Sequence, residues 1–260
     1  SIQSIGDRIG VDTLRITANI NGGFRATGII EATIVEPIDD STLELEVVPN
    51  PIGPSFLDVF VVARRPLAGT PNVIRTYGTI DSTVAIKQLE ADEDGKGVLI
   101  WSGSVRLPTD AAGTVRFEAQ AFTEVGTNVG ATASIEMGTI SAGKRLRLVH
   151  DGAEVIIPPG SLESGQIVAL QSRPLTKTKR SKVNVADGLE AKYEVVLYPL
   201  GITLSQPAVF KWNGPSEKGD GLYRYSGSDW EFLGTTDKSI EFNQISRFSI
   251  LQDLAPPLIR

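Results

Sequence analysis

The stretch that decides the fold runs over residues 151–162 and reads DGAEVIIPPGSL. Its opening Asp-Gly pair is typical of a two-residue hairpin turn. The apolar run 154–157 is long enough for a strand and too short for a helix. Pro158 and Pro159 end that strand because proline donates no hydrogen bond to a sheet, and Gly160 permits a sharp change of direction. The stretch therefore predicts a buried strand between two abrupt turns.

The rest of the chain repeats this pattern of short strands between turns. Apolar and polar residues alternate over 14–20, 43–47 and 115–121, which is the period of a half-buried strand. Residues 66–82 carry several turn residues and are predicted to be a loop. No helical period is sustained anywhere. The expected fold class is all-β, with two antiparallel β-sandwich domains in tandem.

The expected boundaries follow the glycine and proline clusters. Residues 1–36 form an N-terminal β-hairpin extension, which belongs either to the first sandwich or to a domain upstream. Residues 37–140 form the first sandwich and 144–253 the second, with the boundary at 141–143. Residues 254–260 are expected to begin a linker.

Composition excludes several classes of function. The 260 residues carry a formal net charge of −6, whereas a nucleic-acid binder needs a basic face. No apolar run approaches the roughly 20 residues of a membrane span. The absence of cysteine excludes disulfides, thiolate zinc sites and thiol catalysis. We expect no cofactor, no nucleic acid and no membrane span.

Two family resemblances follow from these motifs. Residues 152–162 fit G-x-x-V-x-I-P-P-G-[AS]-L, which resembles the signature strand of ZU5-like domains, a β-sandwich module of receptors and adaptors that also occurs in bacterial surface proteins. The later stretches 200–207, 222–233 and 246–251 are similar to that family as well, so the resemblance covers about 144–253. Residues 37–140 resemble bacterial immunoglobulin-like domains through the segments 101–108 and 119–130.

No catalytic constellation is expected. His150 is the single histidine and the only candidate imidazole base, and no G-x-S-x-G nucleophile motif is present. Residues 138–144 match most of a phosphate-binding loop, but Arg145 stands where the magnesium-binding hydroxyl belongs, and a strand rather than a helix is predicted to follow. We interpret His150 as a polar residue at a strand end.

Three groups of residues are weak binding candidates. Glu90, Asp92 and Asp94 resemble the first half of a calcium loop, but Trp101 stands where a bidentate glutamate belongs, which favours a solvated turn and no metal site. A basic cluster that would suit an anionic polysaccharide or a lipid headgroup, or is a solvated loop, comprises Lys177, Lys179, Arg180 and Lys182. Aromatic residues that would build a sugar-stacking platform, or that fill the core or pair across strands, are Trp212, Tyr223, Tyr225 and Trp230.

The ZU5-like resemblance also raises self-cleavage, because some members cut their own chain before the serine of a His-Phe-Ser motif. The matching positions here are Arg247, Phe248 and Ser249. Arginine stays protonated at neutral pH and is not a base, so the chain is expected to remain intact.

The sequence therefore predicts a non-catalytic structural or interaction module of a larger secreted or cell-surface protein, with bacterial surface proteins as the nearest setting. It would serve as a spacer or as an adhesion or assembly surface. Its expected partners are other domains of the same parent protein, another surface protein or a polysaccharide. Three alternatives stay open: a C-terminal accessory region of a secreted hydrolase such as a subtilisin-like protease, a carbohydrate-binding module, and a cytoplasmic adaptor as in animal ZU5 proteins.

Overall fold

The protein is all-β over the part that the structure, a computed structural model, describes. These residues are 10–20, 24–34, 43–50, 55–89, 98–108, 110–175, 189–227 and 229–253, with side chains described from residue 43 onward. They contain no helix, and their strands pair in several antiparallel sheets. The chain divides into two compact units, Ser1–Thr42 and Leu43–Arg260.

The first unit contains a two-stranded hairpin. β1 (Gly10–Ile20) pairs with β2 (Phe24–Ile34) over their whole length, from Gly10 opposite Ile34 to Ile20 opposite Phe24. The alternating pattern over 14–20 thus correctly predicted a strand that returns on itself.

The second unit contains all remaining strands. In chain order they are β3 (Leu43–Pro49), β4 (Phe56–Ala63), β5 (Asn72–Tyr77), β6 (Ile80–Thr83), β7 (Lys87–Gln88), β8 (Leu99–Arg106), β9 (Gly113–Phe122), β10 (Asn128–Thr139), β11 (Leu146–His150), β12 (Ala153–Ile157), β13 (Ile167–Pro174), β14 (Leu189–Tyr198), β15 (Thr203–Trp212), β16 (Asp220–Tyr225), β17 (Trp230–Thr235), β18 (Ile240–Gln244) and β19 (Arg247–Asp253).

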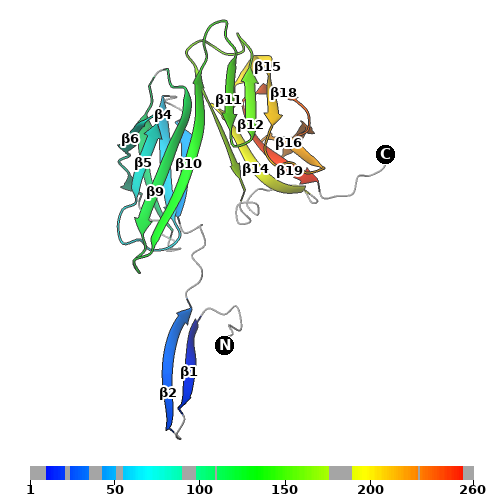
Figure 1. Cartoon of the computed structure of the whole chain (residues 1–260). Coiled ribbons are helices and arrows are strands. Elements are labelled where there is room, and N and C mark those ends of the chain that lie inside the picture. Colours follow the sequence, from blue (N-terminus) through cyan, green and yellow to red (C-terminus); the bar gives the residue numbers. More distant parts are fainter. Residues whose placement is uncertain are drawn as a thin grey trace. The chain divides into compact units, whose positions relative to one another are not determined.

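These strands form one large sheet and two smaller ones. The large sheet has nine strands in the order β17-β16-β19-β14-β13-β10-β9-β5-β6. The smaller sheets have the orders β3-β4-β8-β7 and β11-β12-β15-β18. In Figure 1, the long strand β10 lies between the group that contains β4, β5 and β9 and the group that contains β11, β12 and β14.

Two hydrophobic cores lie against opposite faces of the nine-stranded sheet. Ile167 and Ala169 of β13 belong to the core built with β3, β4 and β8, whereas Val168 and Leu170 belong to the core built with β11, β12 and β15. Successive side chains of a strand point to opposite faces. Strand β13 is therefore buried on both sides. The sheet continues without a break from the half that contains the first core (β3 to β10) to the half that contains the second core (β11 to β19).

The stretch 151–162 adopts the predicted structure. Asp151 (φ 40°) and Gly152 (φ 86°) form the two-residue turn between β11 and β12, and both have the positive φ that a type I′ hairpin turn requires. β12 ends at Ile157, directly before the two prolines. Gly160 (φ 76°) then turns the chain away. Both ends of this strand were thus correctly predicted from the sequence.

The prediction of a loop over 66–82 is wrong from residue 72 onward. This segment contains β5 and β6, which turn at Gly78 (φ 60°) and pair between Ile74–Thr83 and Tyr77–Ile80. β6 is the last strand of its sheet, and Ile80 is largely exposed. A strand with little to bury carries no apolar alternation, which is why the pattern missed it. Residues 141–143, the expected domain boundary, form the turn between β10 and β11.

No helix among the described residues is long and apolar enough to cross a lipid bilayer.

Candidate functional site

The hairpin of β16 and β17 gathers four aromatic residues on one face, at the end of the nine-stranded sheet. Tyr223 pairs with Phe232 and Tyr225 pairs with Trp230 across the two strands. Directly paired residues share a face, as do residues two apart along a strand. The four rings therefore lie side by side on one surface, which we name the aromatic face.

The rings of the aromatic face are paired and partly exposed. The centroids lie 5.2 Å apart in both pairs, with interplanar angles of 59° for Tyr223–Phe232 and 52° for Tyr225–Trp230. Phe232 is 54% exposed and Tyr225 37% exposed. The hydroxyl of Tyr225 donates a hydrogen bond to the carbonyl of Gly227 at 2.7 Å, which fixes the ring beside the turn. The surface is thus preformed rather than assembled on binding.

A buried carboxylate continues this surface toward the middle of the sheet. Tyr223 lies opposite Ser249, Ser249 opposite Glu194, and Glu194 opposite Arg173 on the neighbouring strands. Glu194 is almost fully buried and binds two guanidinium groups, with Arg173 Nη2 at 2.6 Å from its Oε2 and Arg247 at its Oε1. The cluster ties β13, β14 and β19 together beside the aromatic face.

Tyr198 lies on β14, the same strand as Glu194, and is paired with Ala169 of β13. Burial, together with the carboxylates of Glu194 and Glu46, raises the pKa of Tyr198 to about 12. Arg173 also reaches Glu46 on β3, at 3.5 Å. Arg173 thus connects strand β3 electrostatically with strands β13 and β14. Because its pKa is raised, the hydroxyl of Tyr198 stays protonated at every physiological pH.

The sequence singled out Tyr223, Tyr225 and Trp230, which lie on the aromatic face, together with Trp212, which does not. Phe232 was missed, although its position two residues after Trp230 places it on the same face. Trp212 is not part of the aromatic face. It is buried in the second core, 4.8 Å from the ring of Tyr193, and its Nε1 donates to the carbonyl of Pro215 at 3.0 Å. The bland interpretation as core is correct for Trp212.

His150 is held in the tautomer opposite to that of a catalytic base. The backbone N–H of Ser172 donates to its Nδ1 at 3.0 Å, so Nδ1 carries a lone pair. The proton of the neutral ring must then sit on Nε2, which lies 2.8 Å from Ser134 Oγ and donates to it. A base that activates a serine needs a free lone pair at that nitrogen. The arrangement therefore orients the serine without activating it.

Burial lowers the pKa of His150 below its usual value, and the nearby carboxylates of Asp151 and Glu136 offset part of that shift. The side chain is only 6% exposed. Because both ring nitrogens have hydrogen-bond partners, the neutral ring is fully satisfied in this position. His150 is thus a buried structural group at the end of β11.

The residues that match a self-cleavage motif lie within the regular strand β19. Arg247 is bound to Glu194, and Phe248 is buried against Phe242 at a centroid distance of 5.2 Å. The hydroxyl of Ser249 donates to the carbonyl of Tyr193 at 2.7 Å. No group in these contacts accepts a proton from that serine as a base would.

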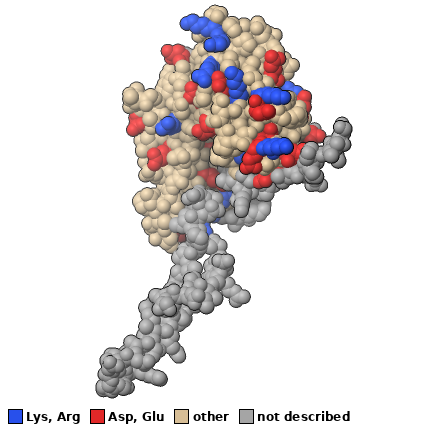
Figure 2. Space-filling model, turned by 45° about the vertical axis from the view of Figure 1, so that its right-hand side comes forward, with Lys and Arg blue, Asp and Glu red and all other residues tan. Residues whose placement is uncertain are grey.

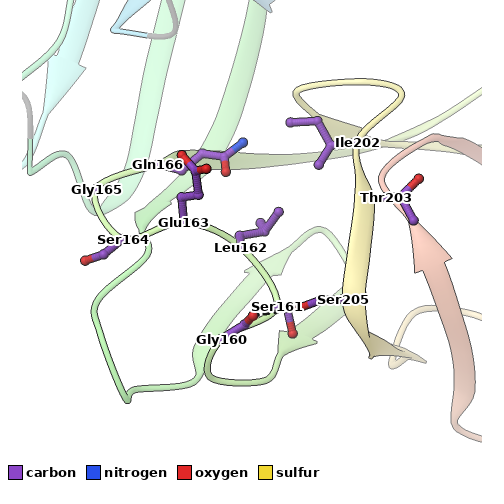
Figure 3. A pocket seen from close by; sticks show the side chains of 10 residues that line it. All are labelled: Gly160, Ser161, Leu162, Glu163, Ser164, Gly165, Gln166, Ile202, Thr203 and Ser205. Carbon is purple, nitrogen blue, oxygen red and sulfur yellow. Dashed lines mark hydrogen bonds between the residues drawn. The ribbon is translucent and has the colours of Figure 1, made fainter.

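A hollow of about 780 Å³ lies at the Pro-Pro-Gly corner and is lined by residues 160–166 with Ile202, Thr203 and Ser205. In Figure 3, Leu162 and Ile202 project toward one another. The backbone N–H of Gln166 donates to the carbonyl of Glu163 at 3.3 Å. The hydroxyl of Ser161 has no hydrogen-bond partner, but it is closed off from solvent. A ligand in the hollow would not reach it without rearrangement, so the aromatic face is the stronger candidate.

Two predicted groups lie outside the described residues. They are the calcium candidates Glu90, Asp92 and Asp94 and the basic cluster Lys177, Lys179, Arg180 and Lys182. The part of the chain that the structure describes contains no group of three or more side chains suited to hold a metal ion. On the face shown in Figure 2, basic and acidic side chains are interspersed over the described residues rather than gathered into one basic area.

Comparison of the chain with protein families, with curated proteins and with solved structures finds no match in any of the three.

Proposed function

We propose that this chain is a non-catalytic structural and interaction module of a larger secreted or cell-surface protein. The aromatic face is its contact surface, and the expected order of an immunoglobulin-like sandwich followed by a ZU5-like sandwich is part of the same proposal. The observation that carries it is the exposure of Phe232 and Tyr225 on a rigid sheet end. Exposed apolar side chains that lie together on a soluble protein often mark an interaction site.

Ring geometry favours a protein partner over a polysaccharide. Both ring pairs are tilted by more than 50°, so they present a ridged surface rather than a flat stacking platform. A surface of tyrosine, tryptophan and phenylalanine side chains beside an arginine has the composition of a binding hot spot in protein–protein interfaces. Arg247 supplies that arginine, because its strand neighbours β16 directly. The partner is another domain of the same parent protein.

The absence of catalysis is supported by the tautomer of His150. A fluorophosphonate probe, which labels activated serines, should leave Ser134 unmodified at neutral pH. Labelling of Ser134 would show that the imidazole abstracts its proton and would overturn this part of the proposal.

The contact is tested with two variants of the full chain. The double substitution Tyr225→Ser and Phe232→Ser removes the exposed rings of the aromatic face. The matched control is Phe122→Ser, because Phe122 is 59% exposed on β9 and lies outside the face. Binding to the segments that flank this chain in its parent protein is measured by titration calorimetry. We expect the double variant to bind at least 10-fold more weakly and the control to bind like the wild type.

Two results would redirect the proposal. Equal affinity of all three proteins for the flanking segments would show that the aromatic face is not the contact. Retardation of the wild type, and not of the double variant, in a gel that contains a neutral polysaccharide would establish the carbohydrate-binding alternative instead.

A further inference from the structure

His150 joins the two sheets that enclose the second core. It is the last residue of β11, in the four-stranded sheet, and both hydrogen-bond partners of its ring belong to the nine-stranded sheet. Ser134 lies on β10 and Ser172 on β13. Ser172 also donates through its hydroxyl to the carbonyl of Asp151 at 3.2 Å. The turn between β11 and β12 is thus fastened to β13 at two points.

The imidazole is poised so that a second proton breaks one of these contacts. Nε2 already carries a hydrogen, so an added proton must go to Nδ1. That nitrogen would then present N–H toward the N–H of Ser172, only 3.0 Å away. Two donors facing each other repel, and the buried amide would lose its acceptor. The alternative acceptor for the new N–H is Asp151 Oδ2, at 3.6 Å from Nδ1.

We propose that His150 is an acid-sensitive latch: when Nδ1 takes up a proton, the ring releases the amide of Ser172, turns toward Asp151 and loosens the β11–β12 hairpin from β13. This device is independent of the proposed contact surface, because neither His150 nor its two hydrogen-bond partners belongs to the aromatic face.

Burial of the ring and the charges around it set the pH range in which the latch opens. The carboxylates that face it are Asp151 in the turn and Glu136 on β10, and both favour the imidazolium. Burial is the larger effect and keeps the pKa below the usual value of about 6.5. Since the unfolded chain binds this proton more readily than the folded chain, the stability that the neutral ring contributes is complete above about pH 6.5 and is lost as the pH falls below it.

The test uses the fact that His150 is the single histidine of the chain. One imidazole Hε1 resonance reports its protonation directly by NMR. Hydrogen exchange of the Ser172 amide, corrected for the intrinsic pH dependence of exchange, reports the latch. We expect the protection factor of Ser172 to fall at least 10-fold from the neutral to the protonated end of the imidazole titration, with the same midpoint as that titration.

Two variants separate the latch from general acid loosening. His150→Asn places an amide oxygen near the position of Nδ1 and cannot titrate, so the protection of Ser172 should become independent of pH. Asp151→Asn removes the carboxylate that favours the imidazolium, so the midpoint should move to lower pH. Asparagine is well tolerated at the φ of 40° found at this position.

Three results would overturn the latch. One is a Ser172 protection factor that stays constant while the imidazole titrates. Another is an equal loss of protection in His150→Asn and the wild type. The third is a midpoint in Asp151→Asn that stays unchanged or rises, and this result decides the question alone if His150→Asn does not fold.

Discussion

Gly103 offers the sharpest test of the packing in the first half. It lies on β8 opposite Val59 of β4, where the chain segment that precedes β7 passes across the strand. A Cβ at this position would lie 2.4 Å from the carbonyl oxygen of Ala85 and 3.0 Å from Ile86 Cγ2. The nearer atom belongs to the backbone, so it cannot rotate away. We expect Gly103→Ala to force that segment off the strand.

The cost of Gly103→Ala can be set against a small gain. Overpacking of this kind destabilises by about 1–3 kcal/mol. Replacing glycine by alanine also reduces the freedom of the unfolded chain, which stabilises by about 0.4–1 kcal/mol. The midpoints of these two ranges give a net loss of about 1.3 kcal/mol. Each kcal/mol lowers the melting temperature by roughly 2–4 °C in a protein of this size.

Gly130→Ala is the matched control on a neighbouring sheet. Its added Cβ would meet nothing closer than the carbonyl oxygen of Ala119 at 3.4 Å, which is an ordinary contact. The same chemical change should therefore be neutral or stabilise by about 0.5 kcal/mol. Thermal unfolding followed by far-UV circular dichroism compares both variants with the wild type. A Gly103→Ala protein as stable as the wild type, or equal shifts in both variants, would refute the reasoning.

Three further outcomes follow from the charged and buried groups. Glu194→Gln leaves two arginines without their shared counter-charge and should destabilise the folded protein by about 2–3 kcal/mol, as urea titration can measure. The loss is smaller than for a fully buried ion pair, because both arginines are partly exposed. Hydrogen bonding from Arg147 holds the pKa of Glu154 below its usual value, so its stabilisation is present above about pH 4.5 and lost below it, and Glu154→Gln should flatten that part of the pH–stability curve. Purified chain should stay unbroken between Phe248 and Ser249 through days at neutral pH, as intact-mass spectrometry can verify.

The individual strands and turns could be predicted from the sequence, because each of the signals that define them acts within a few residues. The Asp-Gly turn, the strand that follows and the prolines that end it are all set by backbone chemistry at those positions. The alternation over 115–121 likewise places one face of β9 in the core. Strand class, turn position and the all-β composition of the described residues were therefore predictable without long-range information.

The shared sheet was not predictable, because it depends on pairing between distant strands. β13 reads as an unbroken run of buried residues, and such a run signals burial on both faces without saying what lies on each. Its partner β10 lies on the other side of a complete hairpin in the sequence. The environment of His150 was hidden for the same reason, since Ser134 and Ser172 come from two different strands.

The aromatic face was partly predictable. The alternate spacing of Tyr223 and Tyr225 placed them on one side of a strand, and Tyr225 lies opposite Trp230 directly beside the loop that joins the two strands, but beyond these residues the pairing shifts register between Leu222 and Tyr223. That irregularity leaves no mark in the composition. Aromatic alternation alone also does not separate a buried ring such as Trp212 from an exposed one, because the two strands look alike until their sheet order is known.

The unbroken ladder between β10 and β13 has a mechanical consequence. Four consecutive residue pairs, from Glu136–Leu170 to Thr139–Ile167, span the place where a swivel between the two halves would have to sit. Bending there would expose Met137 and Ala169 to water and break the ladder in the same motion. Bending between the two halves therefore requires several backbone hydrogen bonds to break together, so this part of the protein is stiff. Any movement needed to reach a partner must come from another part of the chain.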